Sequence, residues 1–193
     1  MPRDAWYNYR TGRATVIYFD LTQGRNRFRT YNKDDPMDMN DEQLLPLLRK
    51  VTIFAGLADA GLKRIVSDCN TMKYAAGRTI IRQGTPATEI YIVLEGTVKV
   101  ILDMDEYPLE ICEFSTGNCL GEASIIGITS HSASVTAVTD ATLLVLTRKT
   151  LMHLFETDKE FFAMLILNIA RELARRLHKT DELLLEYARK ARR

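Results

Sequence analysis

The sequence predicts a mainly β domain that is flanked by helices and followed by one long helix. Three observations predict this fold class. Two short helical patterns come before residue 70, alternating β-branched stretches separated by turn residues fill residues 72–146, and apolar residues recur at helical steps beyond residue 159. With 193 residues, of which 46% are hydrophobic, the chain is long enough for one domain with appendages.

Residues 1–40 differ from the rest because they are rich in tyrosine, arginine, asparagine and aspartate. The stretches TVIYFDL (15–21) and RFRTY (27–31) flank the turn-like TQGRN, which favours a hairpin. The alternative is a poorly ordered extension. NKDDPMDMND (32–41) is then expected to be a linker.

Residues 41–146 are expected to form the body of the domain. Two short helices are predicted, over residues 40–54 and 57–69. The strand-like stretches that follow are TII (79–81), EIYIVLEG (89–96), TVKVIL (97–102), LEICEF (109–114), SASVTAV (132–138) and ATLLVL (141–146). Short strands at this spacing, with glycines between them, favour a closed or sandwiched all-β body.

The C-terminal region, residues 147–193, is predicted to be helical, with one helix over residues 148–155 and a long one from Lys159 to about Arg189. An apolar seam follows the long helix and consists of Phe162, Ile166, Ile169, Leu173, Leu177, Thr180, Leu184 and Tyr187. A single domain has too little surface of its own to cover so long a stripe. We therefore expect a two-fold homodimer that pairs through residues 159–189. The alternative is a helix that folds back on its own barrel.

This order of elements resembles the cyclic-nucleotide-binding domain family, of the catabolite activator protein and kinase A regulatory subunit type, from residue 45 to residue 190. The resemblance is carried by VTIFAGL (51–57), AAGRTIIRQG (75–84), IYIVLEGTVKV (90–100), GNCLGEASI (117–125) and SASVTAVTDATLLVL (132–146). It implies a β jelly roll with a phosphate-binding cassette at residues 117–135. It also implies cyclic AMP or cyclic GMP as the candidate ligand.

The cassette holds most of the candidate ligand-binding residues, which are Gly121, Glu122, Ala123, His131, Ser132, Ala133 and, outside it, Thr180. Gly121 has no Cβ, so backbone can approach a ligand closely there. The resemblance implies that Glu122 accepts a hydrogen bond from the ribose 2′-hydroxyl, and that Ser132 and the amides around Gly121 and Ala123 meet the cyclic phosphate. The alternative for Glu122 is a charge satisfied by its own helix start.

His131 stands where the family has an arginine, directly before the Ser-Ala pair. Arginine carries a permanent charge and a planar fork that grips two phosphate oxygens, whereas imidazole does neither reliably. Losing such a partner costs about 2–5 kcal/mol of binding. Three outcomes are open: a protonated His131 serves, a basic residue such as Arg82 or one from a partner's helix substitutes, or the pocket is retired.

Thr180 is the polar member of the apolar seam. By resemblance to the activator protein's long helix, it would contact the adenine amino group. The alternative is a hydroxyl that bonds to the carbonyl of the preceding turn, which helices tolerate well.

Other functional classes find little support in the sequence. A net charge of +1 gives no basic field for nucleic acid, and no helix-turn-helix is expected after the long helix, so we expect no nucleic-acid partner. No apolar run is long enough to span a membrane, and no export signal is visible. His131, His153 and His178 form no metal-binding pair, and no metal is expected. Three scattered cysteines favour a reducing, cytoplasmic setting.

The sequence therefore predicts a non-enzymatic, cyclic-nucleotide-sensing regulatory module with an altered phosphate site, which acts through an unidentified protein partner. The alternative is a degenerate domain of the same fold that binds no nucleotide and serves only for protein interaction or dimerisation. The preferred base, the partner and the role of residues 1–40 do not follow from the residues.

Overall fold

The structure is a computed structural model and describes residues 13–20, 25–32 and 41–191. The chain divides into two compact units, Met1–Asp38 and Met39–Arg193. In the first unit β1 (Arg13–Asp20) pairs antiparallel with β2 (Arg25–Asn32). The linker expected after this hairpin falls, from residue 33 to residue 40, outside the described residues.

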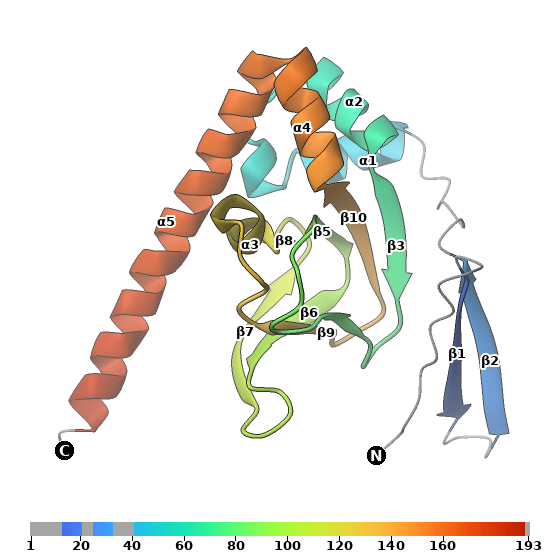
Figure 1. Cartoon of the computed structure of the whole chain (residues 1–193), viewed down its shortest axis with the longest axis vertical. Helices are drawn as coiled ribbons and strands as arrows, with labels where there is room; N and C mark the ends of the chain where they lie inside the picture. The colour runs from blue at the N-terminus through green and yellow to red at the C-terminus, as the bar shows by residue number, and fades with distance from the viewer. Residues whose placement is uncertain (1–12, 21–24, 33–40, 192–193) are drawn as a thin grey trace. The chain divides into compact units, whose positions relative to one another are not determined.

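The second unit contains two four-stranded antiparallel sheets, shown in green, yellow and brown in Figure 1. Their strands are β3 (Asn70–Tyr74), β4 (Thr79–Ile81), β5 (Glu89–Glu95), β6 (Thr97–Leu102), β7 (Leu109–Ser115), β8 (Cys119–Leu120), β9 (Ser134–Ala137) and β10 (Ala141–Thr147). The strand orders are β3-β10-β5-β8 and β4-β9-β6-β7. This arrangement confirms the predicted β jelly roll.

The central strands β5 and β10 are buried on both faces, which explains why they are nearly continuous apolar runs. Val93, Leu143 and Val145 pack in the core between the two sheets. Leu144 and Leu146, which alternate with them along β10, belong instead to the core beneath the helices. Because successive side chains of a strand point to opposite faces, a strand with core on both sides has no polar face.

Helices gather at one end of the sheets, and the longest of them continues past α3 (Figure 1). The helical elements of this unit are α1 (Asp41–Leu48), the 3₁₀ turn η1 (Thr52–Phe54), α2 (Asp59–Asp68), α3 (Glu122–Gly127), α4 (Arg148–Thr157) and α5 (Lys159–Lys190). Asp158 starts α5, since its side chain accepts a 3.0 Å hydrogen bond from the amide of Phe161. Among the described helices, none is both long and apolar enough to cross a membrane.

The apolar seam expected along α5 divides into two halves. Ile169 is buried in the domain's own core, and Phe162, Ile166 and Leu173 pack against that core. Beyond residue 176 the side chains of α5 are exposed. The domain's own surface therefore covers the first half of the stripe, where η1 and α4 pack against α5, and leaves the second half exposed.

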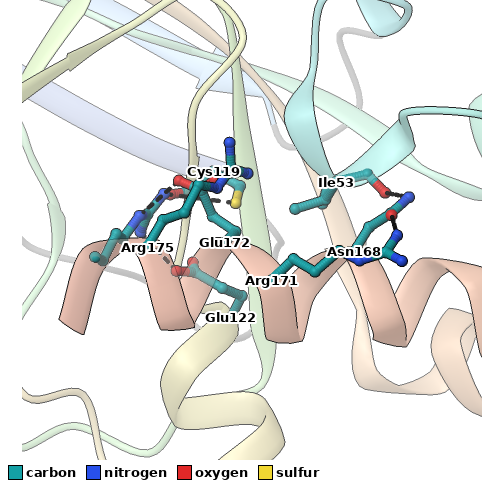
Figure 2. Close-up of polar contacts among 8 residues, drawn as sticks. Ile53, Cys119, Glu122, Asn168, Arg171, Glu172 and Arg175 are labelled. Carbon is teal, nitrogen blue, oxygen red and sulfur yellow. Dashed lines mark hydrogen bonds and ion pairs between the residues drawn. The ribbon is translucent and has the colours of Figure 1, made fainter. Parts of the chain in front are cut away.

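A buried amide fixes the orientation of α5 on the domain. The Asn168 side chain donates to the carbonyl oxygen of Ile53 at 3.2 Å (Figure 2) and to that of Ala55 at 2.8 Å. These bonds join α5 to η1, more than 110 residues earlier in the chain. The same side of α5, about two turns further on at Arg176, reaches the cassette.

Candidate ligand-binding site

The cassette begins with a sharp turn at Gly121, between β8 and α3. Gly121 has a φ of 82°, a left-handed conformation that residues with a side chain rarely adopt. A Cβ here would lie 2.7 Å from the carbonyl oxygen of Glu89 and 3.4 Å from Cε1 of His131. Only glycine therefore allows α3 to start this close to β5.

A cavity of about 120 Å³ opens beside this turn. Six of the seven predicted ligand-binding residues line it, namely Gly121, Glu122, Ala123, His131, Ser132 and Ala133. The cassette brings them together because it leaves one sheet at β8 and enters the other at β9. Since binding pockets for small molecules usually measure about 300–1,000 Å³, this cavity is narrow for a nucleotide.

Glu122 is the most buried charged residue of the cavity wall, with 1% of its surface exposed. Its Oε1 accepts a hydrogen bond of 2.6 Å from Arg176. The amide of Glu122 itself and the Cys119 thiol, a weak donor, lie near the carboxyl and lower its pKa, but Oε2 has no hydrogen-bond partner of good geometry among the described residues. Burial raises the pKa of Glu122, while the charge of Arg176 opposes that rise. A buried acceptor without a donor is costly, and a ligand hydroxyl would satisfy it.

Arg176 reaches the cavity from α5 and was missed from the sequence. Its Nη1 donates to Glu122, its Nη2 donates to the carbonyl oxygen of Cys119 at 2.9 Å, and its Nε donates to Glu172 at 2.9 Å. The guanidinium also lies over the Phe114 ring, 4.5 Å from the ring centroid. Figure 2 shows Cys119, Glu122 and Glu172 gathered at one place along α5. Within the described part of the chain, Arg176 is the only lysine or arginine that lines the cavity.

His131 lies at the cavity wall and is 8% exposed. Its amide donates to the carbonyl of Thr85, and its carbonyl accepts from the amide of Gly84, so its backbone is fixed to that turn. Burial lowers the pKa of His131, although the charge of Glu89 opposes the shift. The lowered pKa favours the neutral imidazole at pH 7, which makes His131 a weak partner for an anion.

Arg82 and Thr180, the two other residues considered for the ligand, both lie apart from the cavity lining. The Arg82 guanidinium pairs with the carboxylate of Asp105 at 2.7 Å on the exposed surface. The Thr180 hydroxyl donates to the carbonyl of Arg176 at 2.9 Å, which is the bond to the preceding turn described above as its alternative. In the described residues, no cluster of three or more histidine, cysteine, aspartate or glutamate side chains could hold a metal ion.

Comparison with known families now identifies the domain. Residues 71–158 match the family model described as "Cyclic nucleotide-binding domain". This part of the chain belongs to that family. The resemblance noted in the sequence is thereby confirmed, as is the jelly-roll fold.

The similar proteins include a kinase regulatory subunit and a catabolite activator protein. The chain is 31% identical over 91 residues to a cAMP-dependent protein kinase type II regulatory subunit of Drosophila melanogaster, covering 47% of the chain and 24% of that protein. It is similar to the solved catabolite activator protein of Thermus thermophilus, with a TM-score of 0.62, 28% identity and coverage of 71% and 63%. The chain spans only 12–24% of the length of the first curated relatives that it matches.

A third similar structure is the regulatory subunit of a cAMP-independent protein kinase A from Trypanosoma brucei. The TM-score is 0.59 at 25% identity, with 68% of this chain and 46% of the other covered. That structure is of a triple mutant, bound to cAMP in its A site, and one of the three substitutions replaces a threonine by an arginine.

Proposed function

We propose that this cyclic nucleotide-binding domain senses cyclic AMP or cyclic GMP through an altered phosphate site, and that it acts through a protein partner rather than as an enzyme. The observation that carries this proposal is Oε2 of Glu122, which is buried in the wall of the cassette cavity and has no hydrogen-bond partner in the described part of the chain. A ribose 2′-hydroxyl would donate to this oxygen. The match covers only 24% of the kinase regulatory subunit, so that relative does not identify the partner of this chain.

The phosphate side of the site is weak in this proposal. His131 is neutral, Arg82 is occupied at the surface, and Arg176 is already shared between two carboxylates. The cyclic phosphate would meet the Ser132 hydroxyl and backbone amides near Gly121, which carry no full charge. We therefore expect lower affinity than an arginine-containing site provides.

Binding also has to widen the cavity. Arg176 is the side chain that a nucleotide must displace, and it belongs to α5. Ligand binding at the cassette would thus change the contact between Arg176 of α5 and Glu122, and would alter the surface that a partner binds. We place this sensing in the cytoplasm, where the three free cysteines Cys69, Cys112 and Cys119 would stay reduced.

The 2′-hydroxyl contact is tested by removing it from the ligand. Cyclic AMP should bind the wild-type domain roughly tenfold or more tightly than 2′-deoxy cyclic AMP, because a hydrogen bond to a buried charged acceptor is lost. Calorimetry at high protein concentration measures both affinities, and the cyclic GMP pair serves as an internal control. Equal affinities for the hydroxyl and deoxy ligands would remove Glu122 from the binding site.

A second candidate function is favoured by the narrowness of the cavity, which Arg176 helps to line. In this alternative, the Arg176–Glu122 contact permanently closes the site and the fold serves only for protein interaction. The outcome of placing arginine at position 131, considered in the Discussion, separates the two.

We further propose that the domain forms a homodimer through α5, residues 159–189. Opposite the face that packs on its own domain, α5 carries an exposed stripe at alternating steps of four and three, made of Ala163, Leu167, Ala170, Ala174, Leu177, Asp181, Leu184 and Ala188. Such spacing is typical of a coiled-coil seam, and Leu177 and Leu184 are 63% and 67% exposed.

The dimer is tested with Leu177→Glu combined with Leu184→Glu. We expect the wild type to sediment as a dimer and the double variant as a monomer, because four charges would enter the seam. Leu183→Glu, on the same helix but off the stripe, is the matched control and should stay dimeric. A monomeric wild type at high micromolar concentration would rule out this interface.

A further inference from the structure

Two buried carboxylates compete for one guanidinium beside the cavity. Glu172 is 8% exposed and Glu122 is 1% exposed. Nε of Arg176 donates to Oε1 of Glu172 at 2.9 Å, while Nη1 of the same guanidinium donates to Oε1 of Glu122 at 2.6 Å. Glu122 belongs to the cassette, whereas Glu172 belongs to the same helix as Arg176 (Figure 2).

Glu172 is well placed to hold Arg176 in one position. The two residues are one helical turn apart on α5, so their contact needs no movement of the backbone. The second oxygen of Glu172 pairs with Arg175. Three of the five N–H donors of Arg176 are already used, by Glu172, Glu122 and the Cys119 carbonyl, and the guanidinium face lies on Phe114, so fewer donors remain for a phosphate.

The balance of charge around this guanidinium is negative. Arg175, the other cation near Glu172, has a side chain that is 61% exposed, so solvent screens it strongly. Among the causes that raise the pKa of Glu122, burial comes first and the charge of Glu172 adds to it, against the charge of Arg176. His131, on the cavity wall, is neutral. The carboxylate of Glu122 in the cavity wall and that of Glu172 behind it therefore outnumber Arg176, the one lysine or arginine in the described cavity lining.

We propose that Glu172 is a positioning residue that sets the charge preference of the cavity, because it holds Arg176 on α5 and away from an anionic ligand. The proposal rests on the proposed function, since it takes the cassette cavity as the ligand site. Glu172 lowers the affinity for cyclic nucleotides without touching them. Arg176, once released, would supply the cation that position 131 lacks.

The test is Glu172→Gln, which removes the charge and retains an amide oxygen that accepts from Nε of Arg176. Two ligands are titrated, cyclic AMP and its uncharged methyl ester, which differ in charge at the phosphate. We expect the affinity for cyclic AMP to rise about tenfold and that for the ester to change less than about twofold, since only the anion gains from the lost carboxylate. A merely structural role of Glu172 would change both affinities together.

Glu186→Gln is the matched control, because it removes the same charge from the exposed far part of α5, where Glu186 pairs with Lys190. It should leave the ratio of the two affinities unchanged. Circular dichroism tests whether Glu172→Gln is folded. If the variant is unfolded, the wild type provides the test, because the proposal requires that the wild type bind the uncharged ester at least as tightly as cyclic AMP.

An unchanged affinity ratio in folded Glu172→Gln, or a wild type that clearly prefers the anion, would overturn the role of Glu172. The His131→Arg variant distinguishes this failure from that of the proposed function. If His131→Arg binds cyclic nucleotides and Glu172→Gln shows no gain, only the inference about Glu172 fails. If neither variant binds them, both fail.

Discussion

Replacing Arg176 by methionine is expected to lower the free energy of unfolding by about 3–5 kcal/mol, because it leaves a buried carboxylate without its cation. Glu122 is almost inaccessible to water, and Arg176 provides its hydrogen bond of 2.6 Å. Methionine can fill the space over Phe114 but cannot donate a hydrogen bond. Urea unfolding, followed by circular dichroism, measures the loss.

This loss of stability should shrink at acidic pH. Burial already raises the pKa of Glu122, and removing the opposing charge of Arg176 raises it further. A carboxyl with a higher pKa in the folded chain than in the unfolded chain favours folding below its unfolded pKa, and this contribution is lost as pH rises through its folded pKa. As the pH falls from about 7.5 to about 5, the unfolding free energy of the variant should therefore approach that of the wild type.

Arg175→Met is the matched control for the stability measurement. Arg175 neighbours Arg176 on α5 and also pairs with Glu172, but its side chain is largely exposed. We expect it to cost less than about 1 kcal/mol, as exposed ion pairs do. If Arg176→Met costs no more than Arg175→Met, the buried pair with Glu122 does not stabilise the domain.

The β body could be predicted because its signals are local. Alternating residues and turn glycines predicted six of the eight strands of the two sheets, all but β3 and the two-residue β8, and the spaced motifs selected the jelly roll among all-β folds. The cassette residues also lie within fifteen positions of one another, from Gly121 to Ser132 and Ala133. Because the order of motifs along the chain identified the cassette, it also predicted that these residues line the same cavity.

Arg176 could not be predicted as part of the site, because its contact with Glu122 joins residues 54 positions apart. The sequence suggested only that the charges Glu172 and Arg176 lie off an apolar seam, which is usual for solvent-facing residues. Which face of α5 turns toward the cassette depends on tertiary packing, including the anchoring of Asn168 on η1. A buried ion pair one turn apart on a helix leaves the same sequence pattern as an exposed one.

The apolar seam of α5 is another feature whose surroundings depend on tertiary packing and could not be predicted from the sequence. Ile169 and Leu177 lie on one predicted stripe, yet the first is buried in its own domain and the second is exposed. Periodicity predicts that a helix has an apolar side but does not identify what covers it. For Thr180, the resemblance suggested a base contact, while its hydroxyl bonds to the preceding helical turn.

Placing arginine at position 131 is the second large effect that we expect. A permanent cation with a planar fork would return to the phosphate side of the cavity, which is worth about 2–5 kcal/mol, or roughly 30-fold to several thousandfold in affinity. The backbone of His131 is fixed to the turn at Gly84 and Thr85, and its imidazole lies against Gly121. An arginine side chain at position 131 would therefore extend from the same backbone position in the cavity wall.

His153→Arg is the matched control for this gain. His153 lies on the exposed surface of α4, so the same substitution adds the same charge away from the cavity. Its affinity for cyclic nucleotides should equal that of the wild type. A similar gain in both variants would indicate general attraction by charge rather than a restored site.

Calorimetric titration of cyclic AMP and cyclic GMP into the wild type and His131→Arg is the decisive measurement. If the cassette cavity is a cyclic-nucleotide site that lacks only its phosphate anchor, the wild type binds weakly and His131→Arg binds at least about 30-fold more tightly. Folded His131→Arg protein that gives no binding heat with either nucleotide would contradict this. It would leave the domain as a jelly-roll scaffold closed by Arg176 and Glu122.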